Sequence, residues 1–195
     1  EPFIEKLINQ LKKNSIKNFL ILTGYKKKII QNYYKNKKNV KIHNGSKNWS
    51  TLTRIIKAKR LIKKNFLLMY CDNYLNNYNI KKQINLKNKK KSNLIFSVVL
   101  KKNNQKGTIV KDKLKIYYKK GILSKFTEAG YILTNKNFFF KDIMKFKKNI
   151  DLSVYLNFLT NNYSAYGIDY KKNYQCIENQ SLLKKTKKYF KVNQK

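Results

Sequence analysis

The sequence predicts an α/β fold with a mostly parallel sheet and a small antiparallel excursion. Short apolar runs alternate with stretches of helical periodicity along the first half of the chain, as βαβ units require. The 195 residues are 42% hydrophobic, which is enough to bury one sizeable core. No internal repeat or Pro-rich linker divides the chain. We therefore expect one domain over residues 1–195.

The first half contains predicted strands separated by predicted helices. Pro2 suits the first turn of a helix, and apolar residues follow it with helical spacing. The predicted helices are 3–13, 25–34 and 52–62, and the predicted strands are 19–22, 40–43 and 66–71. Because a helix separates each strand from the next, these strands are expected to run parallel.

The second half is less regular. A helix is predicted at 80–88 and a strand at 94–100, and two short strands near 108–110 and 114–117 are the expected antiparallel excursion. A strand at 126–133 should return to the sheet, and Asp151 is the predicted N-cap of a helix that ends near residue 159. Short strands are predicted at 165–168 and 175–177, with a final helix after Asn179.

The net charge of +37, from 46 Lys and Arg against 9 Asp and Glu, is typical of a protein that binds a polyanion. However, Arg54 and Arg60 are the only arginines, although Arg is the residue best suited to bidentate phosphate recognition. Lys, Asn, Ile, Tyr and Phe, whose codons are A/T-rich, make up most of the chain. We therefore expect salt-sensitive, non-specific binding to nucleic acid, and a dedicated basic nucleic-acid-binding domain stays an open alternative.

The cysteines and the apolar runs bear on the compartment. Cys71 and Cys176 lie far apart and form no paired spacing, so neither a disulfide framework nor a zinc site is predicted. No apolar stretch approaches the roughly 18 residues that span a bilayer, and no signal peptide is visible. We expect a cytoplasmic protein with no membrane partner.

Asp72 is the residue that most strongly suggests a function. It ends the apolar run 66–71 in a chain with only 9 acidic residues. In α/β sheets, ligands bind in the crevice outside the carboxyl ends of the strands, where a carboxylate can reach a metal-bound phosphate. The alternative is that Asp72 merely caps the turn that follows the strand.

Six short motifs extend along nearly the whole chain. In order they are Pro2-Phe3-Ile4-Glu5, Thr23-Gly24-Tyr25-Lys26 after an apolar run, Trp49-Ser50-Thr51-Leu52, Tyr70-Cys71-Asp72-Asn73, Glu128-Ala129-Gly130-Tyr131 and the helix at 151–159. Their types and order resemble the sugar-phosphate nucleotidyltransferase family, whose members join a sugar 1-phosphate to a nucleotide. The resemblance implies a Rossmann-like, three-layer α/β/α fold of the GT-A-like kind.

The resemblance also implies site residues and substrates. Asp72 would be catalytic and would hold Mg²⁺. The family's second metal aspartate has no match at its own position, so Asp169 is the candidate second ligand from a shifted register, with Glu178 as the other choice and a surface turn as the alternative role of Asp169. Ser50 and Thr51 would contact the nucleotide, whereas Glu128 and Gly130 would contact the sugar. The implied partners are a nucleoside triphosphate and a sugar 1-phosphate, and the oligomeric state is left open.

The chain departs from the family pattern at several positions. The family's Gly-rich phosphate loop, with its first strand, belongs before Pro2, so we expect the chain to lack both and to be inactive by itself. Cys176 stands where the family has its second metal aspartate, and Cys71 stands where it has a glycine. Residues 117–120 offer no carboxylate for the family's sugar motif. An inactive relative that acts as a binding or regulatory module is therefore a second alternative.

Overall fold

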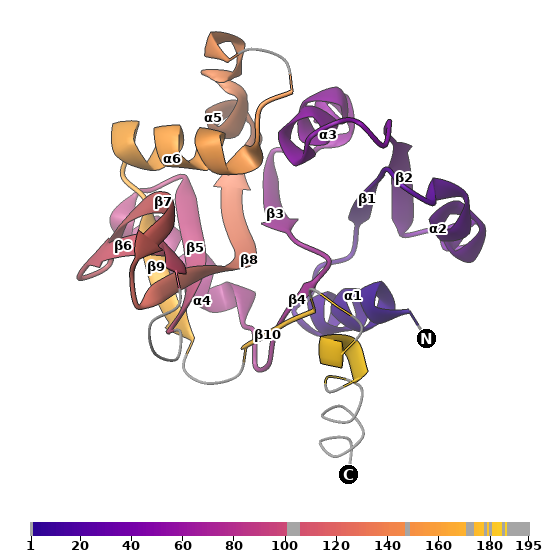
Figure 1. Cartoon of the computed structure of the whole chain (residues 1–195), viewed down its shortest axis with the longest axis horizontal. Helices are drawn as coiled ribbons and strands as arrows, with labels where there is room; N and C mark the ends of the chain where they lie inside the picture. Colours follow the sequence, from indigo (N-terminus) through magenta and orange to yellow (C-terminus); the bar gives the residue numbers. More distant parts are fainter. Residues whose placement is uncertain are drawn as a thin grey trace.

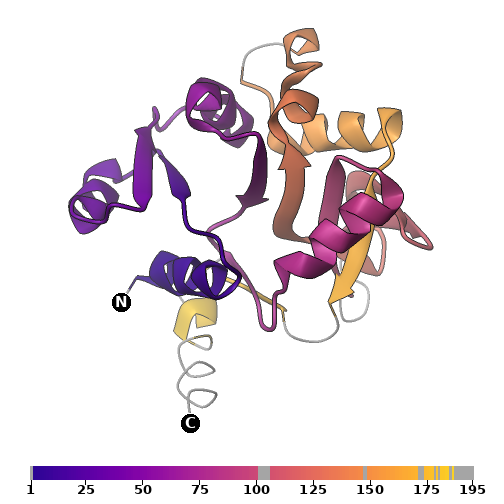
Figure 2. The same ribbon diagram turned by 180° about the vertical axis from the view of Figure 1, so that it is seen from behind.

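The computed structural model describes residues 2–100, 106–146, 149–170, 174–177, 179, 181–184 and 186. Strands form a central layer with helices on both faces (Figure 1). Helices α3 (Thr51–Lys57), α5 (Lys136–Phe140) and α6 (Leu152–Asn162) cover one face, and α1 (Phe3–Lys13) and α4 (Ile80–Lys90) cover the other (Figures 1 and 2). The predicted three-layer arrangement is thus present.

Most elements coincide with the predicted segments. The helices are α1 (Phe3–Lys13), α2 (Lys27–Tyr34), α3 (Thr51–Lys57), α4 (Ile80–Lys90), α5 (Lys136–Phe140) and α6 (Leu152–Asn162), with short 3₁₀ turns η1 (Lys59–Leu61) and η2 (Ile143–Lys145). The strands are β1 (Phe19–Thr23), β2 (Val40–Asn44), β3 (Asn65–Met69), β4 (Asn73–Leu75), β5 (Leu94–Leu100), β6 (Lys106–Asp112), β7 (Lys115–Leu123), β8 (Phe126–Asn135), β9 (Tyr166–Tyr170) and β10 (Tyr174–Cys176). Residues 181–184 are helical, within the predicted final helix.

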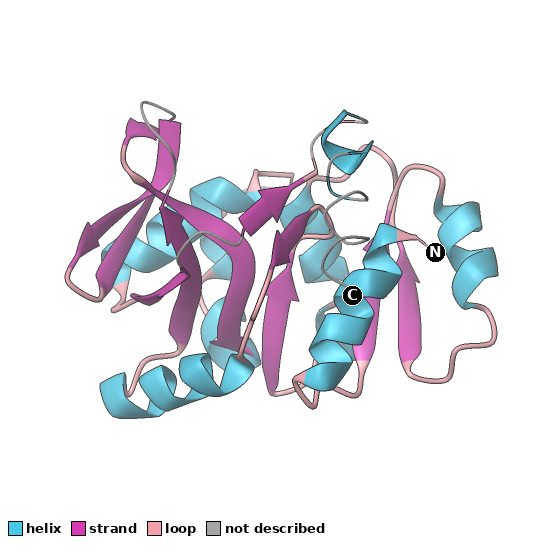
Figure 3. Ribbon diagram, turned by 90° about the horizontal axis from the view of Figure 1, so that it is seen from below, coloured by secondary structure: helices cyan, strands magenta, loops and turns pink. Residues whose placement is uncertain are grey.

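The strands of the described residues form three sheets. β1 and β2 pair in parallel, and β4 and β10 pair antiparallel. The other six form one sheet in the order β3-β8-β5-β9-β7-β6, and β6 also pairs with β8, so that this end of the sheet curls back on itself. Figure 3 shows the strands face on.

The prediction of a mostly parallel sheet is wrong. Within the six-stranded sheet, β5 and β9 are parallel, whereas β8 runs antiparallel to both β3 and β5. The β6–β7 hairpin adds the predicted antiparallel excursion. The reason is that β8 follows a hairpin with no helix between, so it returns to the sheet in the opposite direction and lies between β3 and β5.

Two apolar clusters pack on the two faces of the sheet. The larger cluster joins α3, α5 and α6 to β5, and includes the fully buried Phe96, Phe139 and Tyr155. The smaller cluster lies on the face of α1 and contains Leu11 and Tyr131. No helix in the described part of the chain is long and apolar enough to cross a membrane.

Candidate functional site at the carboxyl end of β3

Asp72 lies just beyond the carboxyl end of β3, as predicted. The hydrogen-bond ladder between β3 and β8 continues past the end of β3, because the Tyr70 backbone N–H donates to the Gly130 carbonyl at 3.1 Å. Cys71 and Asp72 then form an exposed turn that leads into β4. The backbone carbonyl of Asp72 accepts from the Ile177 N–H at 2.8 Å. The turn is therefore held between β8 and the segment that contains β10, and Asp72 is exposed on a backbone that is fixed by these hydrogen bonds.

Glu128 is the buried acid of this region. It lies on β8 with 6% of its surface exposed. Its Oε1 accepts from the Gly130 N–H, and its own N–H donates to Thr108 Oγ1 at 2.9 Å. Burial raises the pKa of Glu128 to about 8, the Gly130 hydrogen bond opposes the shift, and the charge of Asp72 adds to it. Glu128 is therefore largely protonated at neutral pH, and Asp72 is close enough for its charge to act on it.

Gly130 is required by the backbone and by packing. Its φ of +80° lies in the region that favours glycine, and a Cβ there would come within 2.5 Å of Asn73 Nδ2. This absence of a side chain allows β8 to approach the start of β4 closely. Gly130 therefore places Glu128 beside the Asp72 turn. This structural role is separate from the sugar contact that the family resemblance implies for Gly130.

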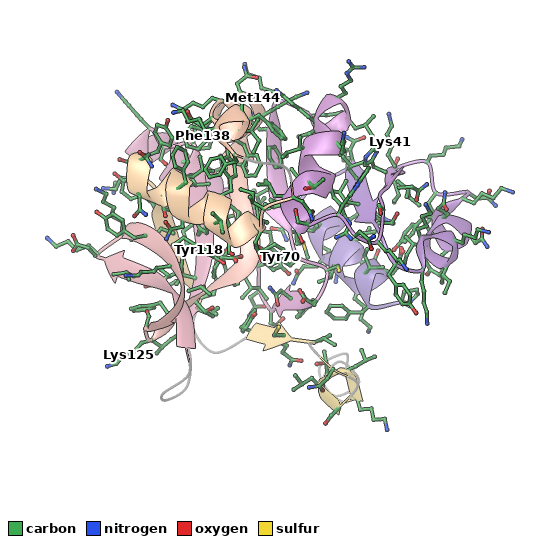
Figure 4. All side chains as sticks on the ribbon, turned by 45° about the horizontal axis from the view of Figure 1, so that its top comes forward. Lys41, Tyr70, Tyr118, Lys125, Phe138 and Met144 are labelled. Atoms are coloured by element: carbon green, nitrogen blue, oxygen red, sulfur yellow. The ribbon has the colours of Figure 1, made fainter. Side chains whose placement is uncertain are left out.

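Three tyrosines lie within reach of the charge of Glu128: Tyr118 is buried, and Tyr70 and Tyr174 are half-buried. Desolvation raises the pKa of all three, and the charge of Glu128 contributes in each case. Figure 4 shows Tyr70 and Tyr118 near the middle of the molecule. Tyr174 donates from its hydroxyl to Asn73 Oδ1 at 2.9 Å. No local pattern indicates this tyrosine cluster, because its members are far apart along the chain.

Ser50 and Thr51 lie at the start of α3. Ser50 is the N-cap, and its Oγ accepts from the Thr53 N–H at 3.2 Å. The Ser50 N–H donates to Asn149 Oδ1 at 2.7 Å, which ties the start of α3 to the loop before α6. Thr51 is the exposed first residue of α3. Both residues follow the carboxyl end of β2, the edge at which a parallel unit binds its ligands.

Asp169 has a different setting from Asp72. It lies on β9 and forms an ion pair with Lys111. Val98 of β5 pairs with Glu128 on one side and with Asp169 on the other, so Asp169 is two strand spacings, roughly 10 Å, from Glu128. Within the described residues, no three His, Cys, Asp or Glu side chains form a group that could hold a metal ion.

Cys176 occupies the place next to the Asp72 turn. It pairs with Asn73 across the β10–β4 ladder, and the next residue, Ile177, bonds the Asp72 carbonyl. A carboxylate on β10 at this position would lie beside Asp72. The residue present is a thiol, which is a poor ligand for Mg²⁺. Glu178, the other candidate second ligand, lies outside the described residues.

A positively charged pocket of about 670 Å³ lies at the carboxyl ends of β1 and β2. Gly24 and Tyr25 line it from the end of β1, and Gly45 and Ser46 line it from the end of β2. Lys26, Lys27, Lys28 and Lys47 are also in its lining, whereas Asp72 is not. The Gly24-Tyr25 turn is one of the sequence motifs, but its residues do not by themselves predict a pocket.

Comparison of the fold with known structures gives close matches at low sequence identity. A glucose-1-phosphate thymidylyltransferase, so described provisionally, from Bacillus anthracis in complex with a sucrose matches 94% of this chain and 80% of its own, with a TM-score of 0.81 and 12% identity. HddC from Yersinia pseudotuberculosis complexed with GMP-PN matches 97% of this chain and 86% of its own, with a TM-score of 0.77 and 18% identity.

A third match is UDP-glucose pyrophosphorylase complexed with UDP-glucose, which covers 98% of this chain and 88% of its own chain, with a TM-score of 0.78 and 14% identity. No protein-family model and no curated protein sequence matches the chain. The chain therefore has the mixed α/β fold that these nucleotidyltransferases share.

Proposed function

We propose that this protein is a nucleotidyltransferase that joins a sugar 1-phosphate to a nucleoside triphosphate and releases pyrophosphate. The observation that carries the proposal is the exposed Asp72 just beyond the carboxyl end of β3, held by its backbone and close to the buried Glu128. The match to a glucose-1-phosphate thymidylyltransferase supports it, because that name describes transfer of a nucleotide to a sugar phosphate. The low identities leave the sugar and the base open.

Asp72 is the residue that we propose as the metal ligand. Mg²⁺ takes one or two carboxylates and fills its other positions with water and phosphate oxygens, so a single Asp fits an ion that arrives with the triphosphate. Bound there, Mg²⁺ would neutralise charge on the phosphates. Asp169 is a weaker choice, because it is paired with Lys111.

The reaction needs no side-chain nucleophile. An oxygen of the sugar phosphate attacks the α-phosphorus, the bond from that phosphorus to the bridging oxygen breaks, and pyrophosphate leaves with the electron pair. The protein supplies position and charge. Ser50 and Thr51 would hold the nucleotide at the carboxyl edge of β2. Glu128, protonated at neutral pH, could donate to and accept from a sugar hydroxyl.

The experiment is a pyrophosphate-release screen of the full-length protein. The four common nucleoside triphosphates are combined with a panel of hexose and heptose 1-phosphates, with Mg²⁺ or with excess EDTA. We expect release that requires both substrates and is abolished by EDTA. Absence of release for every pair, from protein shown to be folded by its thermal transition, would count against the proposal.

A second candidate is a binding module that keeps the fold without the reaction. Cys176 favours it, because the strand that meets the Asp72 turn brings a thiol instead of a second carboxylate. This candidate predicts saturable binding of a nucleotide or nucleotide sugar by calorimetry together with no pyrophosphate release. The first candidate predicts saturable binding together with pyrophosphate release.

A further inference from the structure

Arg54 contacts the turns that follow β1 and β2. It belongs to α3, and its Nη2 donates to the backbone carbonyls of Ser46 and Lys47, each at 3.3 Å. Both carbonyls are in the loop that leads from β2 to α3, and the side chain of Arg54 is half-buried. Arg54 therefore fastens this loop to the helix that has Ser50 and Thr51 at its start.

The guanidinium group of Arg54 also lies against Gly24, which directly follows β1. A Cβ on Gly24 would come within 2.6 Å of Arg54 Nη2, 3.0 Å of Cζ and 3.1 Å of Nε. The first of these distances is too short for a non-bonded contact, so a larger residue at this position would displace the guanidinium group. Gly24 thus leaves the space that the head of Arg54 fills.

The stem of Arg54 makes the corresponding contact with Gly45, which directly follows β2. A Cβ on Gly45 would come within 3.3 Å of Arg54 Cγ and 3.1 Å of Trp49 Cε3. The Gly45 N–H donates to the Thr23 carbonyl at 3.0 Å, which links the end of β2 to the end of β1. One side chain therefore contacts both turns, with its head on the first and its stem on the second.

An arginine is unusual in this chain. Arg54 and Arg60 are the only arginines among 46 Lys and Arg, and Arg60 is exposed in η1. Arg54 Nε is buried and has no hydrogen-bond acceptor among the described residues, which costs stability. A lysine would not carry this cost, but its ammonium lacks the planar fork that lies against Gly24 and reaches two carbonyls. The contacts with the two turns are therefore what the guanidinium group contributes.

The same two turns form part of the wall of the pocket of about 670 Å³. Its lining includes Gly24 from the first turn and Gly45 from the second, but not Arg54 itself. Among the described residues β1 and β2 pair only with each other, and a two-stranded sheet is marginally stable by itself. The spacing of the turns therefore depends on contacts outside this sheet, and those of Arg54 reach both turns.

We propose that Arg54 is a positioning residue that fixes the spacing of the two turns, and with it the shape of a pocket that receives the nucleotide. The second part rests on the proposed function, which places the nucleotide at the carboxyl edge of β2. Four lysines in the lining suit a ligand with phosphate groups, and none of the described lining residues is acidic. Arg54 acts through the turns and needs no contact with the ligand.

Trp49, the only tryptophan of the chain, reports on this place, because it is half-buried in the loop that Arg54 fastens and lies against Gly45. Arg54→Lys and Gly24→Ala disturb one contact from its two sides, and Arg60→Lys is the matched control. The first two variants should shift the emission of Trp49 and raise its quenching by acrylamide at least about twofold, since the loop opens more often. Arg60→Lys should leave both as in the parent.

A double-mutant cycle shows whether Gly24 and Arg54 act through one contact. The three atoms nearest to a Cβ on Gly24 all belong to Arg54. Gly24→Ala should therefore lower the midpoint of thermal unfolding in the parent, and should lower it by less than about half as much in Arg54→Ala, where the shorter side chain leaves room. Equal shifts in the two backgrounds would overturn the inference.

The consequence for the reaction is a change in KM. With the substrate pair found by the screen, Arg54→Lys should raise KM for the nucleoside triphosphate at least about tenfold and keep kcat within about threefold, because Arg54 shapes binding and does not touch the reacting atoms. Arg60→Lys should keep both constants. An unchanged KM in Arg54→Lys would show that the pocket does not receive the nucleotide.

The role of Arg54 and the proposed function fail in different ways. Unchanged emission and quenching of Trp49 in both Arg54→Lys and Gly24→Ala overturn the role of Arg54, whether or not the protein is active. Absence of pyrophosphate release by the folded parent counts against the proposed function, and the Trp49 and unfolding measurements still decide the role of Arg54. Should Arg54→Lys not fold, Gly24→Ala takes its place in each assay.

Discussion

At the scale of single residues, the buried Glu128 is the group whose ionisation is most altered by folding. An exposed Glu has a pKa of about 4.3. Burial in the fold raises the pKa of Glu128 to about 8, so the native state retains a proton that the unfolded state has lost between these values. The contribution of this group to stability is therefore present in full below about pH 4 and falls as the pH rises towards 8.

The substitution Glu128→Gln should remove this dependence of stability on pH. The amide is neutral at every pH, and its oxygen can still accept from the Gly130 N–H. Relative to the variant, the parent protein should lose up to a few kcal/mol of unfolding free energy between pH 5 and 8. Urea denaturation at pH 5, 6, 7 and 8 measures this difference. Parallel curves for the two proteins would show that Glu128 does not titrate in this range.

At the scale of elements, the contact between β8 and β4 depends on a glycine. Gly130→Ala incurs backbone strain at a φ of +80° and a clash with Asn73. Gly121 on β7 is the matched control, because its φ is +81° but a Cβ there would meet nothing within 4 Å. Gly121→Ala should cost about 1–2 kcal/mol from strain alone, and Gly130→Ala should cost about 1–3 kcal/mol more.

Chemical denaturation of both glycine variants gives the two costs. Because Gly130 also places Glu128 beside the Asp72 turn, Gly130→Ala should lower pyrophosphate release in protein that is still folded, whereas Gly121→Ala should not. Equal costs for the two variants would mean that Asn73 moves aside freely and that the close approach of β8 is not needed.

The elements differ in how far their sequence predicts them. Local signals placed α1, β5 and α6, because helical periodicity, an unbroken apolar run and the Asp151 cap are properties of neighbouring residues. β4 was missed, since a strand of three residues carries no periodic pattern. The run at 66–71 predicted a strand buried on both faces. The strand exists as β3, but its residues are half-buried because one edge is open among the described residues.

The candidate site was predictable in part. The position of Asp72 at the end of a strand follows from the apolar run before it, and the start of α3 at Ser50 follows from N-cap preferences. The nearness of Glu128 to Asp72 depends on β8 lying beside β3. This ladder pairs residues from Asn65 with Asn135 to Met69 with Tyr131, which are too far apart in sequence for a local pattern to encode. The family resemblance names both Asp72 and Glu128 as site residues, whereas their spacing along the chain does not indicate that they belong to one site.

At the scale of the whole molecule, the net charge of +37 should dominate association with polyanions. We expect the protein to bind DNA and RNA of any sequence at low salt. Because this binding releases counterions, its affinity should fall by a factor on the order of 10³ or more between 50 and 200 mM salt. Fluorescence anisotropy with unrelated oligonucleotides measures this. A preference for one sequence that survives at 200 mM salt would favour a dedicated nucleic-acid-binding domain instead.

The fold of the whole molecule also bears on the role of Asp72. The proposed function gives the Asp72 carboxylate a place in the reaction, whereas a cap of the following turn would serve the fold alone. An amide keeps the size and much of the capping ability of the carboxylate but removes the charge that Mg²⁺ requires. The two roles can therefore be separated by a single substitution.

The most direct measurement is pyrophosphate release by Asp72→Asn, compared with the parent protein and with Asp112→Asn, which changes an exposed acid at the end of β6. With the substrate pair found in the screen and saturating Mg²⁺, Asp72→Asn should lose at least about 100-fold in rate while its thermal transition is preserved, and Asp112→Asn should keep the parent rate. Equal rates for Asp72→Asn and the parent would contradict the central claim.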